Sequence, residues 1–408
     1  MKIPELLAPA GDMEKLRIAL EYGADAVYLG GEAFGLRALA GNFSHKDLAE
    51  AIELTHSRGK KLYLTINAYV PQKEQDVLKD YLLRLRDLPV DAYIVSDPGV
   101  LAMIRDIDPE RELHLSTQAN TTNAAAVRFW QAAGVKRINL ARELSLEDVS
   151  AIYQQTDVEL EIFIHGAMCV AYSGRCLLSS ALTGRSANQG ACAHPCRWSY
   201  ALVEETRPGQ YMPIETDEAG TFVMNSRDLC LLEQLPQLIQ AGAASLKIEG
   251  RMKSLYYLAA VTRIYRAALD RYRANPADYA CDPLWLDELD KVSHRPYSTG
   301  FLFGMDDPQV HTTDSRYRRS HDFVGIVREI LPEGNCVVEG RNRFFPDEQL
   351  ELIGPEMRQE TFQVGNLRKE NGAVLTVGQP NLRVVMQLPQ GARPGDLLRR
   401  ESSEGKAV

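Results

Sequence analysis

The sequence contains no apolar run long enough to span a bilayer, and its first residues lead into a predicted strand without the apolar core of a signal peptide. We therefore expect a cytoplasmic protein with no membrane partner. An excess of basic residues is also absent, because the chain has 46 lysines and arginines but 55 aspartates and glutamates, for a net charge of −9. This balance argues against indiscriminate nucleic-acid binding through a uniformly basic surface, although it leaves room for a local basic groove.

The usual protease motifs are missing as well. The chain has no H-E-x-x-H zinc motif and no G-x-S-x-G nucleophile elbow, and no cysteine-protease signature follows Cys169. Its 408 residues, 45% hydrophobic and 25% charged, are typical of an ordinary globular chain with one large domain and one smaller one.

An alternation of short apolar runs with longer amphipathic stretches extends from residue 5 to about residue 275. The apolar runs are Leu6–Pro9, Ala26–Gly30, Lys61–Asn67, Ala92–Asp97, Leu113–Asn120, Arg137–Arg142, Leu160–His165 and Ser245–Glu249. Eight strands that alternate with eight helices predict an α/β fold, a closed (β/α)8 TIM-like barrel. A doubly wound open sheet is the alternative.

The alternation is interrupted once, after the seventh strand. About 60 residues separate it from the next helical pattern, which we place at Asp228–Ala241, whereas such connections usually have about 2–6 residues. Loops that follow barrel strands lie on the catalytic face, so the insertion 166–227 should cap the barrel mouth. We predict a barrel over 1–275, a linker and extension over 276–321, and a small all-β domain, a barrel, over 322–408.

Four of the seven cysteines lie in this insertion, with the spacing C-x6-C-x15-C-x3-C: Cys169, Cys176, Cys192 and Cys196. Structural disulfides are not expected in a reducing compartment, whereas thiolates bind iron–sulfur clusters and zinc. Structural zinc sites usually pair their cysteines closely on both sides, and here only the second pair is close. The spacing therefore favours an iron–sulfur cluster, with zinc as the second choice and buried reduced cysteines as the alternative without metal.

Polar residues end most of the predicted strands. If the barrel closes, they converge on one substrate pocket: Asn67, Gln118, Asn120, Arg142, His165, Lys247, Glu249 and Arg251. Within this set, Arg142, Lys247 and Arg251 form a cationic group suited to carboxylates or phosphates. Helix capping is the alternative role for any single polar residue, and a histidine at a strand end is as often structural.

Two arginine clusters next to aromatic residues are candidates for RNA binding. Their members are Arg316, Arg318 and Arg319 around Tyr317, and Arg341 and Arg343 before Phe344 and Phe345. Guanidinium groups interleaved with aromatic rings can follow phosphates and stack on bases. A solvated charged surface is the more common meaning of such runs.

Several motifs resemble the collagenase-like peptidase family, family U32. They are His165-Gly-Ala-Met-Cys169, Tyr172-Ser-Gly-Arg-Cys176, Asn188-Gln-Gly-Ala-Cys192, Cys196-Arg-Trp198, the opening 4–11, the run 23–30 and Ser245-Leu-Lys-Ile-Glu-Gly-Arg251. The resemblance extends from residue 4 to about residue 305, and the β-rich tail is similar to the C-terminal domain of the family.

The resemblance implies a function beyond what the residues alone show. The best-understood members are RNA and quinone hydroxylation proteins, which hold a 4Fe–4S cluster on four cysteines at matching positions and use prephenate as the oxygen source. The length and the stretch 188–198 are most similar to a bacterial subgroup needed for 5-hydroxyuridine at the wobble position of tRNA. The resemblance thus implies an oxygen-independent tRNA hydroxylase whose partners are tRNA and prephenate or a similar carboxylate.

The resemblance transfers the four cysteines one by one, but it transfers no catalytic base, so the catalytic residues stay unknown. The alternatives are a collagenase-like peptidase, a related hydroxylase of ribosomal RNA or of a quinone precursor, and a non-catalytic RNA-binding factor. An oligomer, with itself or with a related family member, is a further expectation that the sequence leaves open.

Overall fold

The computed structural model describes residues 3–36, 41–169, 176, 178–195, 202–203, 211–212, 216–217, 220–221, 227–304 and 317–402. Two predicted site residues, Cys196 and Arg316, lie outside these ranges. None of the helices in the described part of the chain has the length and apolar character needed to cross a membrane.

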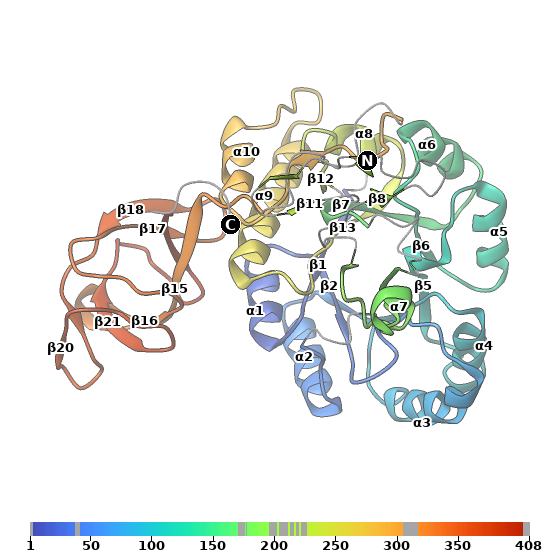
Figure 1. The fold of residues 1–408 in the computed structure, drawn as a ribbon, viewed down its shortest axis with the longest axis horizontal. Coiled ribbons are helices and arrows are strands. Elements are labelled where there is room, and N and C mark those ends of the chain that lie inside the picture. The colour runs from blue at the N-terminus through green and yellow to red at the C-terminus, as the bar shows by residue number, and fades with distance from the viewer. Residues whose placement is uncertain are drawn as a thin grey trace.

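Eight parallel strands form a closed barrel (Figure 1). They are β1 (Glu5–Pro9), β2 (Ala26–Gly30), β3 (Lys61–Ile66), β4 (Ala92–Val95), β5 (Glu112–Leu115), β6 (Arg137–Asn139), β7 (Glu159–Ala167) and β13 (Ala243–Ile248). Each strand pairs with its successor in this series, and β13 pairs with both β7 and β1, which closes the ring. The (β/α)8 prediction is confirmed, and the open sheet is excluded.

Helices surround this barrel on the outside (Figure 1). They are α1 (Met13–Glu21), α2 (His45–Ser57), α3 (Gln75–Leu85), α4 (Pro98–Ile107), α5 (Ala124–Ala132), α6 (Leu146–Gln154), α8 (Leu235–Gln240) and α9 (Leu255–Ala274). Local sequence sets their ends: Ser44 and Asp47 form a capping box at the start of α2. Gly242, which follows α8, has a φ of +94°, a conformation that costs glycine little.

The predicted helix over Asp228–Ala241 is wrong in its first part. Asp228–Cys230 is the short strand β12, which pairs antiparallel with the end of β7 and parallel with β14 (Tyr297–Ser298). Strand β7 extends beyond the barrel to Ala167, so its exposed edge is available for this pairing. The apolar spacing of the segment fits a helix, but hydrogen bonding to a neighbouring strand decides its conformation.

The described parts of the insertion begin beyond β7 and hold the helix α7 (Leu178–Thr183) and two short strand pairs, β8 (Leu202–Val203) with β9 (Tyr211–Met212) and β10 (Thr216–Asp217) with β11 (Gly220–Thr221). The insertion contacts the loop after β3, because the backbone amide of Tyr69 donates to the carbonyl oxygen of Asn188 at 3.5 Å. That loop follows a barrel strand, so the contact lies on the carboxyl-end face of the barrel.

A separate all-β domain follows the segment predicted as linker and extension, which carries α10 (Pro283–Asp290) and β14. Its eight-stranded antiparallel sheet contains β15 (His321–Ile330), β16 (Asn335–Gly340), β17 (Gln349–Ile353), β18 (Gln359–Gln363), β19 (Leu367–Arg368), β20 (Val374–Leu375), β21 (Arg383–Gln387) and β22 (Leu397–Glu401). Its side chains, among them Val338, Phe344 and Leu398, form a core of their own. The prediction of a C-terminal all-β domain is confirmed (Figure 1).

Buried charges join the two domains. Arg399 of β22 donates to Glu288 of α10 at 2.7 Å, and Arg263 of α9 donates to the same carboxylate. All three side chains are inaccessible to solvent. The hydroxyl of Tyr22 in α1 also donates to the carbonyl oxygen of Ile353 in β17 at 3.2 Å. The β domain is therefore fixed against the outer helices of the barrel.

Candidate active site at the barrel mouth

The interior of the barrel has an apolar half and a polar half. The apolar half comes from β1 to β4 and consists of Leu7, Ala26, Tyr28, Tyr63, Ala92 and Ile94. The polar half comes from β5, β6, β7 and β13 and includes His114, Arg137, Glu161, Ser245 and Lys247, all of them buried. Alternate residues of a strand face the same side of a sheet, so each of these strands sends a series of polar side chains inward.

A buried ion pair lies at the centre of the polar half. The ammonium group of Lys247 is 2.8 Å from a carboxylate oxygen of Glu161, and both side chains are at most 5% exposed. Ser245 donates to the same carboxylate at 3.2 Å, and the guanidinium of Arg137 is 3.8 Å away. Burial alone would raise the pKa of Glu161, but the two cations reverse this effect and hold that pKa below its usual value.

A second layer of charges lies below this pair, towards the amino ends of the strands. Arg137 is 2.6 Å from Glu5 and 2.7 Å from Glu159, and the hydroxyl of Tyr63 donates to Glu5 at 2.8 Å. Each buried charge in this layer has a partner of opposite sign, which is the condition under which buried charges are tolerated. The layer forms a fixed polar floor.

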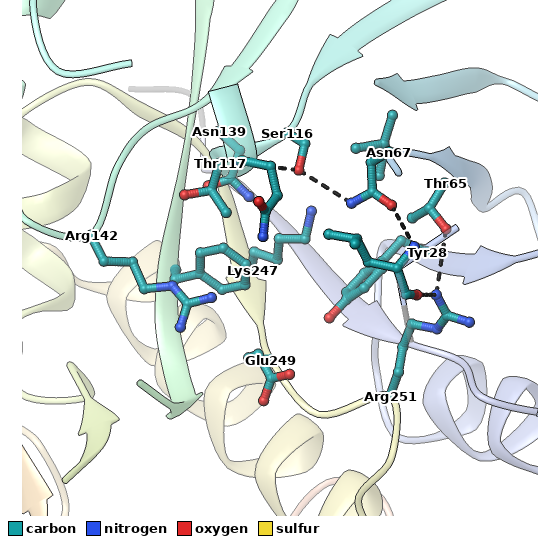
Figure 2. A pocket seen from close by; sticks show the side chains of 14 residues that line it. Tyr28, Thr65, Asn67, Ser116, Thr117, Asn139, Arg142, Lys247, Glu249 and Arg251 are labelled. Carbon is teal, nitrogen blue, oxygen red and sulfur yellow. Dashed lines mark hydrogen bonds between the residues drawn. The ribbon is translucent and has the colours of Figure 1, made fainter. Parts of the chain in front are cut away.

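A cavity of about 90 Å³ opens above this floor at the carboxyl ends of the strands (Figure 2). It is lined by Tyr28, Leu36, Thr65, Asn67, Ile94, Ser116, Thr117, Gln118, Asn139, Arg142, Phe163, Lys247, Glu249 and Arg251. Six of the eight residues that the sequence assigns to a substrate pocket are among them: Asn67, Gln118, Arg142, Lys247, Glu249 and Arg251. Active sites of such barrels lie on this face.

The arginines of the cavity wall already have partners. Arg251 donates to the carbonyl oxygen of Leu36 at 3.0 Å and to the side-chain oxygen of Asn42 at 2.8 Å. Arg142 donates to the carbonyl oxygen of Ala167 at 2.8 Å, and its guanidinium lies 4.1 Å from the centre of the Phe163 ring. Arg142 therefore connects the cavity to the chain that leaves β7 for the insertion.

Asn120 and His165 lie elsewhere, which differs from the sequence expectation. Asn120 ends a short turn after β5 in a left-handed conformation, with a φ of +53°. His165 is 1% exposed, and its ring lies against Tyr257 and Tyr265 of α9 and against Tyr297. Burial lowers the pKa of His165 to about 3, so the ring is neutral at physiological pH.

Sequence reasoning missed several residues of this site, in particular Glu161, Asn139 and Thr117. A signal for Glu161 was present: acidic residues at Glu159 and Glu161 alternate with apolar ones in a strand that a barrel buries on both faces. Asn139 ends the shortest barrel strand, whereas the predicted run Arg137–Arg142 places it inside a longer strand. Only the closed ring shows that it lines the same cavity as Asn67, whose amide nitrogen donates to the Ser116 hydroxyl at 3.3 Å.

Three of the four clustered cysteines lie in the described part of the chain. Cys169 is exposed, Cys176 is buried and Cys192 is half-buried. The backbone amide of His194 donates to the Cys192 sulfur at 3.4 Å. The described residues contain no group of three or more His, Cys, Asp or Glu side chains that could hold a metal ion, and Cys196 lies outside them. The thiols suit iron or zinc chemically, and the cluster stays a prediction from the sequence.

The candidate RNA-binding residues are distributed over the start of the β domain: Arg318, Arg319, Arg341 and Arg343, with Arg316 outside the described ranges. Arg319 lies 3.0 Å from Asp322, and Arg341 lies 3.1 Å from Glu339. These two guanidinium groups are therefore partly neutralised within the chain. The side chain of Arg343 is exposed. RNA binding by these arginines stays a prediction.

Comparison with known proteins places this architecture in a family. Residues 11–312 match the model of "Peptidase family U32", and residues 319–399 match "Peptidase family U32 C-terminal domain". The tRNA hydroxylation protein P1 of Bacillus subtilis is 39% identical over 98% of this chain and 95% of that protein. The tRNA hydroxylation protein P of Escherichia coli is 38% identical over 86% of each chain.

A third relative is named for the modification of ribosomal RNA and not of tRNA. The 23S rRNA 5-hydroxycytidine C2501 synthase of Escherichia coli is 41% identical over 73% of this chain, which corresponds to 45% of that protein. Both domains of the fold are thus matched by the family models, and relatives above 30% identity cover nearly the whole chain. The chain belongs to peptidase family U32.

Proposed function

We propose that this chain is an oxygen-independent, iron–sulfur-dependent tRNA hydroxylase that makes 5-hydroxyuridine at the wobble position, with prephenate or a similar carboxylate as the oxygen donor. The observation that carries the proposal is the similarity to the tRNA hydroxylation protein P1, which extends over 98% of this chain. The similarity to a ribosomal RNA 5-hydroxycytidine synthase supports RNA hydroxylation more broadly and makes ribosomal RNA the alternative substrate.

The arrangement of the barrel supports this function. Strand β7 ends at Ala167, two residues before Cys169, on the same face as the cavity. Arg142 lines the cavity and also donates to the Ala167 carbonyl, so cavity and cysteine-bearing segment are directly connected. A cluster on Cys169, Cys176, Cys192 and Cys196 would supply redox chemistry at the barrel mouth.

The residues of the cavity have assignable roles in this proposal. Lys247, which Glu161 holds in place, and Arg142 orient the reacting groups through charge and hydrogen bonds. The hydrophobic rings of Tyr28 and Phe163 lie next to the Lys247 ammonium, at 4.5 and 5.5 Å from their centres, and limit the access of water to it. Exposed arginines of the β domain, such as Arg343, would bind the RNA backbone.

The test is a complementation experiment that measures 5-hydroxyuridine in bulk tRNA by liquid chromatography and mass spectrometry. A strain that lacks the gene and its close relatives receives the wild-type chain, Cys192→Ala, or Cys281→Ala. Cys281 is also half-buried but lies in the extension after the barrel, so it is the matched control. We expect 5-hydroxyuridine with the wild type and Cys281→Ala only. Unchanged 5-hydroxyuridine without the gene would refute the function.

Two further measurements separate the parts of the proposal. Anaerobic iron and sulfide analysis of the purified chain tests the cluster, and zinc without sulfide would replace it with the second metal. A strain that cannot make prephenate tests the oxygen donor, because the modification should disappear until prephenate is supplied. Proteolysis of collagen-like peptides that persists in Cys192→Ala would instead favour the peptidase alternative.

A further inference from the structure

The segment that precedes Cys192 folds into a tight turn. Residues Ala187–Gln189 form a single turn of 3-10 helix, and the chain leaves it through Gly190, whose φ is +87°. A left-handed conformation of this kind costs glycine little, because glycine has no side chain to clash with the backbone. The backbone amide of Gly190 donates to the carbonyl oxygen of Ala187 at 3.1 Å, which closes the turn. Asn188 is therefore held at a fixed position four residues before Cys192.

Asn188 uses both of its carbonyl groups to connect separate parts of the chain. Its side-chain oxygen accepts a hydrogen bond from the backbone amide of Cys176 at 3.3 Å, and its main-chain oxygen accepts one from the backbone amide of Tyr69 at 3.5 Å. Tyr69 lies in the loop after β3, and its hydroxyl donates to the carbonyl oxygen of Gln118, a residue of the cavity wall, at 2.9 Å. Asn188 thus joins Cys176 to the turn before Cys192 and to the barrel mouth.

Ser179 makes a second link, in the opposite direction. It lies in α7, three residues after Cys176, and is inaccessible to solvent (Figure 1). Its hydroxyl oxygen accepts a hydrogen bond from the backbone amide of Ala193 at 3.0 Å, and Ala193 directly follows Cys192. One link therefore runs from the turn before Cys192 to Cys176, and the other from the residue after Cys192 to the helix after Cys176. These interleaved links fix the two cysteine backbones relative to each other, although 15 residues separate them in the sequence.

Ligands that are fixed in advance bind a metal more tightly than ligands on an unrestrained loop. A loop loses conformational freedom when its ligands gather around a metal, and this loss weakens binding unless the loop is already ordered. Hydrogen bonds that orient the ligands from outside commonly change metal affinity by about 10–100-fold. Thiolates are ligands of iron and zinc, so the links at Cys176 and Cys192 act on ligands of that chemistry.

We infer that Asn188 and Ser179 are positioning residues, which hold Cys176 and Cys192 together as one ordered pair of metal ligands at the barrel mouth. Neither residue is itself a ligand, because each acts through a backbone amide at or next to a cysteine. The inference rests on the proposed function for the identity of the bound group, an iron–sulfur cluster. The two links themselves are independent of which thiolate-binding metal is bound.

The experiment measures binding of cobalt(II) to the full-length chain, because a cobalt–thiolate bond has a charge-transfer absorption that reports on the cysteines directly. The chain is freed of metal with a chelator under anaerobic conditions and is then titrated. Asn188→Leu removes the acceptor oxygen from a side chain of similar size, and Ser179→Ala removes the hydroxyl. We expect each variant to bind cobalt(II) about 10–100-fold more weakly than the wild type. Asn188→Asp keeps an acceptor oxygen for the Cys176 amide and should retain most of the wild-type affinity.

Asn371→Leu is the matched control. The side-chain oxygen of Asn371 accepts a hydrogen bond from the backbone amide of Ala373 at 3.2 Å, in an exposed turn of the β domain. Its substitution removes the same kind of hydrogen bond far along the chain from the cysteines, so binding of cobalt(II) should not change. Thermal melting of the metal-free variants, followed by circular dichroism, identifies a variant that does not fold. If Asn188→Leu is such a variant, Ser179→Ala tests the same pair through the other link.

The outcomes distinguish this inference from the proposed function. A role in folding alone would lower the melting temperature and leave the cobalt(II) affinity of the folded chain unchanged. Unchanged affinity in Asn188→Leu and Ser179→Ala, or a wild-type cobalt spectrum without thiolate bonds, would overturn the inference even if 5-hydroxyuridine depends on the gene. Weaker binding in both variants, with the affinity retained in Asn188→Asp, would support it even if the deletion strain kept its 5-hydroxyuridine.

Discussion

Replacement of Glu161 by glutamine removes the negative charge from the centre of the barrel. At an effective dielectric constant of about 20, unit charges attract by about 6 kcal/mol at the 2.8 Å between Glu161 and Lys247, and by about 4 kcal/mol at the 3.8 Å to Arg137. The desolvation of all three groups offsets much of this attraction, and loss of one partner of a buried pair costs about 3–5 kcal/mol. Because an amide still accepts one hydrogen bond from Lys247, we expect Glu161→Gln to lower the free energy of unfolding by about 3 kcal/mol.

Urea denaturation at pH 7 measures this loss, with Glu329→Gln as the control. Glu329 is 58% exposed and lies 3.6 Å from Arg383, so its substitution should change stability by less than about 0.5 kcal/mol. The double variant Glu161→Gln/Lys247→Met removes both charges and should be less destabilised than the sum of the single variants by about 2 kcal/mol or more. A Glu161→Gln variant as stable as the control, or strict additivity, would refute the reasoning.

The environment of the Glu161 carboxylate also predicts how the stability of the protein depends on pH. The pKa of Glu161 is lowered in the folded protein from its usual 4.5, because Lys247 and Arg137 outweigh the effect of burial. A lowered pKa contributes stability that is complete above the unfolded value and is lost as the pH falls through the folded value. The stability difference between wild type and Glu161→Gln should therefore be constant above about pH 5 and shrink below pH 4.5. A difference that grows on acidification would contradict the sign.

Three further predictions concern other parts of the chain. Arg399→Met should lower the free energy of unfolding by about 3 kcal/mol and speed proteolytic separation of the β domain, because the buried Glu288 carboxylate loses one of its positively charged partners at the domain contact. An unchanged rate of digestion would argue against this role of Arg399. His165, whose pKa burial lowers to about 3, should show no titration of its ring protons by NMR between pH 5 and 8, and a midpoint near 6.5 would show that the ring is accessible. Cys192→Ala should lose most of the iron of anaerobically purified protein while Cys281→Ala retains it, and equal iron in both would exclude Cys192 as a ligand.

The sequence alone was sufficient for the architecture. Apolar runs such as Ala26–Gly30 alternate with capped amphipathic helices, and this local pattern predicts the eight barrel strands and most of the helices around them without knowledge of their packing. The sequence also predicted the insertion after the seventh strand and the change to a β-rich C-terminal domain. The one helix placed too early, at Asp228, failed because its apolar spacing fits both conformations and a distant partner, the end of β7, decided between them.

The chemistry of the site depended on tertiary structure. Strand periodicity indicates that Lys247 faces inward, but it does not show that Glu161, 86 positions earlier in the chain, neutralises it. In the same way, nothing near His165 in the sequence shows that tyrosines of α9 and Tyr297 enclose it away from the cavity. Local preferences set which elements form, because they depend on neighbouring residues. The partners and burial of the site's side chains, and therefore their charge states, depend on contacts between segments that are remote in the sequence. Only the closed barrel brings those segments together.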